Sequence, residues 1–162
     1  MITVAILTLS DKGSKGERED TSGPIIERML KKIDTKIISS DILPDEKALI
    51  KKKLISLCGN VDLILTTGGT GLSPRDVTPE ATKEIIKQEI PGIAEAMRME
   101  GLKKTSRAML SRAVAGVRGK TLIVNLPGSP TAVKENLSVI LDCLPHAIEK
   151  IQGCQKECAR KK

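Results

Sequence analysis

The sequence contains no phenylalanine, tyrosine or tryptophan among its 162 residues, and it has a single histidine. Proteins that bind single-stranded nucleic acids stack the bases on aromatic side chains. That mode of binding is excluded here, and we expect no nucleic-acid partner. A planar ring bound by this protein would have to lie against aliphatic side chains and peptide planes.

The sequence also lacks any apolar run approaching the roughly 20 residues that a membrane-spanning helix needs. Its N-terminal segment, MITVAILTLSD, is too short for a signal peptide and lacks the basic flank. We therefore expect a soluble, cytoplasmic protein with no membrane partner. The four cysteines do not have the spacing of a small secreted scaffold, so we expect reduced thiols.

A strong excess of one charge is missing as well. The formal net charge is +7, but the segment Lys156 to Lys162 holds four basic residues and one acid, which leaves about +4 for the rest. This modest excess suits an anionic ligand without identifying one. The length fits one domain, which we predict at residues 1–153, followed by a basic, loosely ordered tail at residues 154–162.

Short apolar segments and amphipathic stretches alternate along the chain. Buried parallel strands are predicted for ITVAILTL from Ile2, VDLILTT from Val61 and TLIVNLP from Thr121, with a weaker strand at Lys36–Leu43. The stretches between and after them predict helices at 25–32, 46–57, 79–89, 93–103 and 130–151. This alternation predicts an α/β fold with a mostly parallel sheet covered by helices on both faces.

Three of the predicted strands end in polar, glycine-rich loops: LSDKGSKGEREDTSGP, TTGGTGLSPRD and NLPGSPTA. In open α/β sheets the ligand lies outside the carboxyl ends of the strands. The first loop is also far longer than the usual two to six or so residues of such connections. We therefore expect a ligand site at this edge.

The loop after the second of these strands is the richest in glycine. Gly68, Gly69 and Gly71 permit positive φ and let the backbone approach a ligand closely. Thr78 is predicted as the N-cap of the next helix, with Pro79 at its first position, so that free N–H groups attract an anion such as phosphate. The pattern matches neither G-x-G-x-x-G nor the P-loop, and a tight turn without a ligand is the alternative.

Two aspartates are candidate ligands of a metal ion. Asp76 follows the glycine loop and would repel a bare phosphate, but a bound Mg²⁺ would turn that repulsion into a bridge. Asp45, in LPDEKA, is the second candidate. It could equally be the N-cap of the helix predicted from Glu46, and the pattern alone does not decide between the two roles.

The loop NLPGSPTA repeats the arrangement of a strand, a glycine and a helix start. Ser129 is predicted as an N-cap, Gly128 permits close backbone approach, and Asn125 offers a donor and an acceptor to the edge of a heterocycle. Ser111 and Arg112 belong to a stretch that is too polar for the core. A solvated surface is the alternative interpretation of that stretch.

Together, LTLSD, DTSG, LPDE, TTGGTGLSPRDVTPEAT, PGIAEAMR, AMLSRAVAGVRG and NLPGSP resemble the molybdopterin adenylyltransferase family of molybdenum cofactor biosynthesis, from about Ile2 to Ile151. The resemblance implies a three-layer, MogA-like α/β fold and a homotrimer or hexamer. It implies Mg²⁺-dependent transfer of AMP from ATP to the terminal phosphate of molybdopterin, with release of pyrophosphate.

The resemblance also assigns roles to residues. The adenylate loop of the family falls on Gly68, Gly69, Thr70 and Gly71, and its two important carboxylates fall on Asp45 and Asp76, the proposed Mg²⁺ ligands. Positions that line the pterin and phosphate pocket are matched by Ser10, Asp11, Ser111, Arg112, Asn125, Pro127, Gly128 and Ser129.

Three other interpretations compete with this one. Cys143, His146, Cys154 and Cys158 could hold zinc, although the last two are separated by three residues rather than two. A molybdopterin-binding or scaffold protein of the same fold could lack turnover. An enzyme of the competence-damage type, acting on another nucleotide, is disfavoured by the continuous match through AMLSRAVAGVRG and NLPGSP.

Overall fold

The computed structural model describes residues 1–154, so residues 155–162 of the predicted tail lie outside the described residues. The strands are β1 (Ile2–Leu9), β2 (Thr35–Leu43), β3 (Leu63–Thr67), β4 (Gln88–Glu89), β5 (Ala115–Arg118) and β6 (Thr121–Leu126). The helices are α1 (Asp11–Ser14), α2 (Ser22–Leu30), α3 (Lys47–Leu57), α4 (Thr78–Lys83), α5 (Pro91–Leu102), η1 (Ser106–Leu110, a 3₁₀ helix), α6 (Pro130–Ile140) and α7 (Leu144–Ile151). Within this part of the chain, every helix is too short or too polar to cross a membrane.

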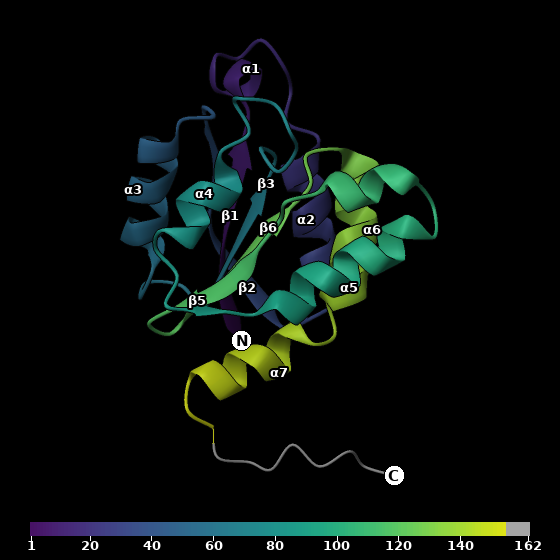
Figure 1. Cartoon of the computed structure of the whole chain (residues 1–162). Helices are drawn as coiled ribbons and strands as arrows, with labels where there is room; N and C mark the ends of the chain where they lie inside the picture. Colours follow the sequence, from purple (N-terminus) through teal and green to yellow (C-terminus); the bar gives the residue numbers. More distant parts are fainter. Residues whose placement is uncertain (155–162) are drawn as a thin grey trace.

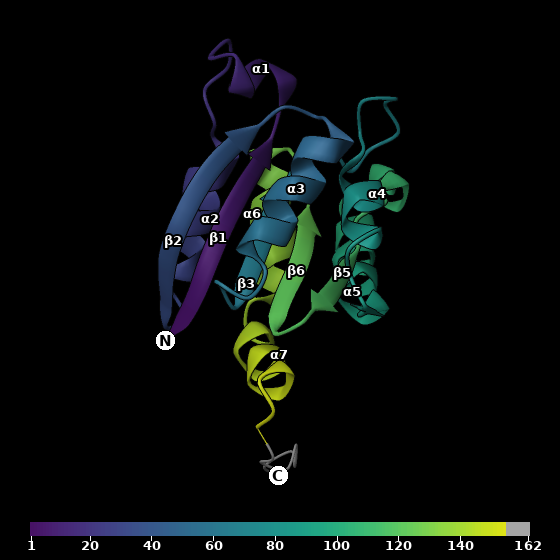
Figure 2. The same cartoon turned by 90° about the vertical axis from the view of Figure 1, so that its left-hand side faces the viewer.

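One six-stranded sheet runs through the molecule (Figures 1 and 2) with the strand order β2-β1-β3-β6-β5-β4. The first four of these strands pair in parallel, whereas β5 and β4 are added antiparallel. From β1 the chain adds β2 on one side and β3 on the other. The strand order therefore reverses beside β1, which is where sheets of this type bind ligands.

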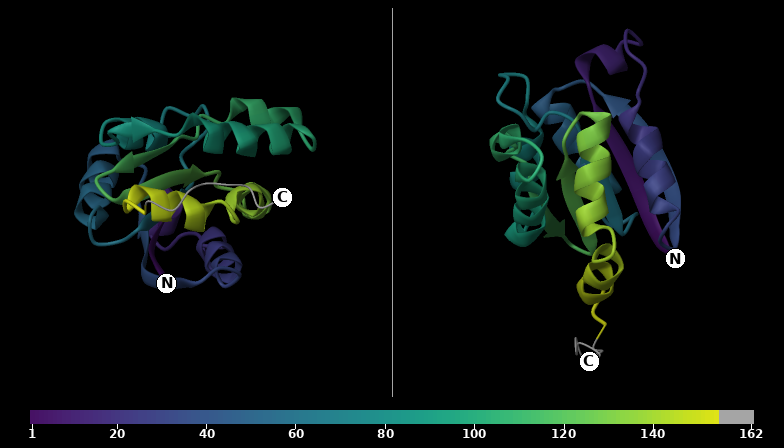
Figure 3. Two further views of the ribbon diagram at one scale, coloured as in Figure 1. Left: turned by 90° about the horizontal axis from the view of Figure 1, so that it is seen from below. Right: turned by 90° about the vertical axis from the view of Figure 1, so that its right-hand side faces the viewer.

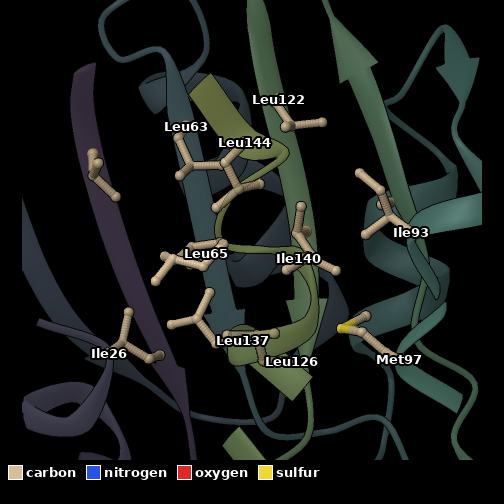
Figure 4. Packing of buried hydrophobic residues seen from close by; sticks show 14 of the residues in the cluster. Ile26, Leu63, Leu65, Ile93, Met97, Leu122, Leu126, Leu137, Ile140 and Leu144 are labelled. Carbon is tan, nitrogen blue, oxygen red and sulfur yellow. The ribbon is translucent and has the colours of Figure 1, made fainter. Parts of the chain in front are cut away.

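Helices cover both faces of the sheet (Figure 3). On one face, α2, α5, α6 and α7 pack against alternate residues of the strands, such as Val4 and Ile6 of β1. Figure 4 shows Leu63 and Leu65 of β3 in the same cluster. On the other face, α3 and α4 pack against the intervening residues, such as Ala5 and Leu7. The alternation follows from the two-residue period of a strand that is buried on both sides. The predicted α/β fold with helices on both faces of a mostly parallel sheet is confirmed.

The predicted helix at 79–89 is wrong in its second half. The helix α4 ends at Lys83, and the chain then forms the short strand β4, which pairs with β5. Proline at position 91 disfavours a helical conformation at Ile90, so the chain must extend before α5 begins. Gly116 of β5 permits the pairing, because a Cβ there would stand only 2.6 Å from the carbonyl oxygen of Gln88.

Two further expectations need correction. The predicted helix at 130–151 is broken into α6 and α7, because Pro145 has no N–H and its ring would clash with the carbonyl of Leu141 in a continuous helix. The stretch SRAMLSRAVAG, predicted to be too polar for the core, enters β5 at its C-terminal end. Its Ala115 is fully buried and Val117 is buried beside it.

Candidate active site

The loops after β1, β3 and β6 meet at the end of the molecule that carries α1, opposite α7 (Figure 1). Strand register explains this, because Thr8 of β1 is paired with Thr67 of β3, and Thr67 is paired with Leu126 of β6. The three carboxyl ends therefore lie side by side. They open into a first cleft of about 660 Å³. The predicted site residues that line it are Ser10, Asp45, Gly68, Gly69, Asp76, Gly128 and Ser129.

A second cleft, of about 390 Å³, lies on the other side of the glycine loop. Gly68 and Gly69 face the first cleft, and Thr70 and Gly71 face the second. Ser129 lines both clefts, and its hydroxyl caps α6 as predicted by accepting the N–H of Ala132 at 3.2 Å. The predicted site residues that line the second cleft are Thr70, Gly71, Ser111, Pro127 and Ser129.

Packing within the protein already requires glycine at positions 68 and 69. Gly68 and Gly69 have φ values of +101° and +64°. A Cβ on Gly68 would collide with the carbonyl oxygen of Leu9, and a Cβ on Gly69 would collide with the hydroxyl of Thr78. Thr78 is buried and is not the predicted N-cap, because α4 already begins at this residue and its hydroxyl donates to the carbonyl oxygen of Gly68 at 3.0 Å.

We predict that Gly68→Ala lowers the free energy of unfolding by about 3 kcal/mol, since the variant combines a left-handed backbone with a steric collision. Gly59→Ala is the matched control, because Gly59 has φ +86° and open space around its Cβ position. The control should cost only about 1 to 2 kcal/mol, the price of the left-handed conformation. Urea unfolding at one protein concentration measures both. Equal losses in the two variants would contradict the collision with Leu9.

Asp45 is not an N-cap. The residue that precedes α3 is Glu46, which makes no side-chain capping bond. Instead, Asp45 Oδ2 accepts the N–H of Asp11 at 3.0 Å, and Asp45 Oδ1 is buried without a hydrogen-bond partner. Burial raises the pKa of the Asp45 carboxyl group, and the negative charges of Asp11 and Asp76 raise this pKa further. A carboxylate oxygen held in this way favours a cation in the cleft.

Asp11 lies beside the first cleft and forms an ion pair with Arg75 from the loop that carries Asp76. The Arg75 guanidinium donates to both carboxylate oxygens of Asp11, at 2.9 and 2.8 Å. These hydrogen bonds lower the pKa of Asp11. Asp11 was predicted to line a pocket, but it is not among the residues that line the two clefts.

The two candidate carboxylates do lie together in the first cleft, as the sequence predicts. Asp76 Oδ2 accepts the N–H of Ser73 at 2.8 Å, which fixes the turn that carries it. Within residues 1–154, no group of three or more histidine, cysteine, aspartate or glutamate side chains is placed to hold a metal ion unaided. Mg²⁺ usually binds one or two carboxylates together with phosphate oxygens and water, and the orphaned Asp45 Oδ1 fits such an ion.

Arg112 does not line either cleft, contrary to expectation. Its guanidinium donates to the carbonyl oxygens of Gly71 at 2.7 Å and Asp76 at 2.6 Å, and it forms an ion pair with Glu80. These contacts join both ends of the loop that carries Asp76 to the start of α4. The structure gives Arg112 the role of a loop anchor.

We predict that Arg112→Met lowers the free energy of unfolding by about 1 to 3 kcal/mol, because two carbonyl groups lose a charged donor. Amide hydrogen exchange at residues 71–77 should accelerate more than exchange in β3. Arg107→Met is the control, since Arg107 is exposed on η1. Unchanged exchange in the loop would show that Arg112 does not anchor it.

Asn125 is also placed differently from the prediction. It is fully buried on β6, so its amide is not available to the edge of a heterocycle. Its Nδ2 donates to the hydroxyls of Thr66 and Thr82, both at 3.0 Å, and its Oδ1 accepts the N–H of Val114 at 3.3 Å. Asn125 therefore links three elements behind the clefts.

Sequence reasoning missed several residues that line the clefts. The first cleft includes Arg18 and Asp20 from the long loop after β1. Asp20 Oδ1 accepts the N–H groups of Ser22 and Gly23 at 2.9 and 3.0 Å, so it caps α2. An aspartate two residues before a helix is a signal that could have identified this cap. For Arg98, which lines the second cleft, we find no comparable signal.

The zinc hypothesis gains no support from the described residues. Cys143 is exposed at the start of α7, and within residues 1–154 it does not share a metal-binding cluster with Cys154 or His146. Cys158, the fourth candidate, lies outside the described residues.

The mostly parallel sheet, with its cleft-lining loops at the carboxyl edge, places the chain in the class of open α/β proteins, which bind their ligands at that edge. Comparison with known proteins narrows this class. Residues 5–146 match the family model described as a probable molybdopterin binding domain. The chain belongs to this molybdopterin-binding family.

Individual relatives agree with the family match. The molybdopterin adenylyltransferase of Helicobacter pylori is 42% identical over 156 residues, covering 94% of this chain and 89% of that protein. The molybdopterin adenylyltransferase of Escherichia coli is 34% identical over 174 residues, covering 98% and 89%. A crystal structure of the molybdopterin biosynthesis enzyme MoaB from Thermus thermophilus is 52% identical, with a TM-score of 0.89, and the match covers 94% of this chain and 98% of that chain. The predicted resemblance to this family is confirmed.

Proposed function

We propose that the protein is a molybdopterin adenylyltransferase, which transfers AMP from ATP to the terminal phosphate of molybdopterin and releases pyrophosphate. The observation that carries this proposal is the pair of clefts that share one wall, the loop Gly68 to Gly71. A transfer between two substrates needs two neighbouring sites with the reacting atoms at their boundary. The close adenylyltransferase relatives support the same activity.

The first cleft suits ATP with its metal ion. Its charged lining includes Asp45, Asp76, Glu19 and Asp20, against one cation, Arg18. Carboxylates in such excess would repel a bare triphosphate, so the nucleotide should bind there more weakly without a divalent cation than with one. Asp45 and Asp76 would hold Mg²⁺, which would neutralise charge on the phosphates.

The second cleft suits molybdopterin. Leu110 offers an aliphatic surface for a ring, and Ser111 and Asn136 offer hydrogen-bonding groups. Arg107 supplies a positive charge at the same cleft, which suits an acidic ligand. Because Ser129 lines both clefts, the terminal phosphate of a pterin bound here would lie near the α-phosphate of ATP.

In this reaction an oxygen of the molybdopterin phosphate attacks the α-phosphorus of ATP. A new phosphorus–oxygen bond forms, and the bond to the oxygen that bridges to the β-phosphate breaks, so that pyrophosphate leaves with the electron pair. The attacking phosphate is already ionised at neutral pH, so no general base is required. Catalysis then rests on positioning and charge neutralisation. The protein contributes the shared wall, the helix start at Ser129 and the two aspartates.

The test is to incubate the purified protein with molybdopterin, Mg²⁺ and ATP labelled at the α-phosphate. We expect the label in adenylyl-molybdopterin and an equal amount of unlabelled pyrophosphate. Removal of Mg²⁺ with EDTA should stop the reaction. Tight binding of molybdopterin without any transfer of label would instead favour the non-catalytic scaffold of the same fold.

We predict that the protein is a trimer or a hexamer. Met99 and Met109 are 68% and 60% exposed on the single chain, and a subunit interface would bury such side chains. The family resemblance implies the same assembly. Sedimentation equilibrium at micromolar concentration measures the mass, and a stable monomer would contradict this prediction.

A further inference from the structure

Two polar groups of Asp45 are held by hydrogen bonds to Asp11, while one oxygen of its carboxylate, which belongs to the lining of the first cleft, has no partner. Its N–H donates to Asp11 Oδ1 at 3.0 Å, and its Oδ2 accepts the N–H of Asp11 at the same distance. Its Oδ1 is buried without a partner and lies 3.1 Å from the position that a Cβ on Gly69 would occupy. Two reciprocal hydrogen bonds to Asp11 therefore decide where this free oxygen points.

Asp11 is itself held by Arg75. Arg75 Nε donates to Asp11 Oδ2 and Arg75 Nη2 donates to Asp11 Oδ1, and this forked geometry fixes direction as well as distance. Arg75 and Asp11 are 64 residues apart in the chain, so the ion pair joins the loop after β3 to α1 across the end of the molecule (Figure 1). Because Arg75 shares its loop with Asp76, the pair also relates the positions of the two carboxylates in the first cleft.

Arg75 is not placed as a ligand of the substrate. Its side chain is 56% exposed, and it is not among the residues that line the first cleft. Its Nε and Nη2 already donate to Asp11. The chain of contacts Arg75–Asp11–Asp45 thus leads from the surface to a residue that lines the cleft and carries one unpartnered carboxylate oxygen.

We propose that Arg75 is a positioning residue that acts through Asp11 to aim Asp45 Oδ1 at the divalent cation that accompanies the nucleotide. This inference rests on the proposed function, because it takes Asp45 as a ligand of that cation. Outer partners that orient a metal ligand commonly contribute about 10- to 100-fold to metal affinity. Arg75 therefore tunes the binding of the metal without touching the nucleotide.

The experiment measures Mn²⁺ binding by electron paramagnetic resonance in the presence of α,β-methylene-ATP, which cannot be cleaved at the reacting bond. Arg75→Met and Asp11→Asn should each weaken Mn²⁺ binding by about tenfold or more. The double variant should be no weaker than the worse single variant, because both changes break the same chain of contacts. Arg75→Lys should recover only part of the affinity, since an ammonium group keeps the charge but not the fork.

Two controls separate positioning from other roles. Affinity for α,β-methylene-ATP in EDTA should be unchanged in Arg75→Met, and Arg28→Met, on the exposed side of α2, should leave both affinities unchanged. If Arg75→Met weakens nucleotide binding in EDTA, or if the two changes are additive, Arg75 binds phosphate directly and the proposal is overturned. Unchanged Mn²⁺ affinity in both single variants overturns it too, with the proposed function intact.

Failure of the proposed function gives a different result. In that case the wild-type protein itself would bind no Mn²⁺ together with the nucleotide, and both proposals would fall. Urea unfolding of each variant shows whether it is folded. Should Arg75→Met fail to fold, Asp11→Asn decides the question alone, because asparagine keeps the backbone hydrogen bond to Asp45 and loses only the ion pair.

Discussion

Replacing Asp76 by asparagine is expected to lower adenylyl transfer at least about a hundredfold, which corresponds to about 3 kcal/mol of lost charge stabilisation. The fold should survive, because an asparagine oxygen can still accept the N–H of Ser73 that Asp76 Oδ2 accepts now. What changes is the charge in the first cleft. The variant loses one of the two carboxylates that would hold Mg²⁺.

The measurement is the rate of label transfer from ATP to molybdopterin, with urea unfolding to verify stability. Asp142→Asn provides the matched control, because Asp142 is exposed between α6 and α7 and the substitution removes the same charge. The control should retain full activity. Near-normal turnover by a folded Asp76→Asn protein would refute the assignment of Asp76 as a metal ligand.

The parallel part of the sheet could be predicted because its strands are buried on both faces. ITVAILTL, LILTT and TLIVNL are almost wholly apolar, which no other element of a small α/β protein requires. The antiparallel edge could not be predicted in the same way. β4 has two residues, both exposed, and it forms because Gly116 lets another backbone approach. Such an edge depends on a tertiary contact and leaves no periodic pattern.

In the site too, residues with local sequence features could be predicted, whereas residues whose roles depend on tertiary contacts could not. Glycines, N-caps and loop aspartates are local features, and Gly69, Ser129 and Asp76 all line the clefts as expected. The roles of Arg112 and Asn125 depend on partners far away in the chain. Arg112 binds a loop some 40 residues earlier, and Asn125 binds Thr66 and Thr82, so their types alone suggested ligand contacts that the fold does not provide.

The role of Asp45 depends on both local sequence signals and tertiary contacts. Its sequence context allowed either a helix cap or a metal ligand, and only the structure shows that α3 is not capped by it. Burial and the charges of Asp11 and Asp76 raise its pKa, which means that the protein carries an ionised group in a place that disfavours the ion. Groups placed at a cost to stability are common in functional sites.

We therefore predict that Asp45→Asn lowers adenylyl transfer at least about a hundredfold, as removal of the other carboxylate does, yet does not destabilise the protein near pH 7. Asparagine can still accept the N–H of Asp11 and keeps the backbone donor to Asp11.

The pH dependence gives the sign of the stability effect. A raised pKa means that the folded state binds the Asp45 proton more tightly than the unfolded state does. Protonation of Asp45 therefore stabilises the fold fully below the ordinary pKa of 3.8, and this stabilisation is lost as the pH rises through the pKa of Asp45 in the folded protein. Asparagine does not titrate, so the variant does not lose this stability as the pH rises. Its free energy of unfolding, relative to that of the wild type, should therefore increase from pH 4 to pH 7 in metal-free buffer. A relative decrease over that range would show that the ionised Asp45 stabilises the fold, and its part in the site would then need another explanation.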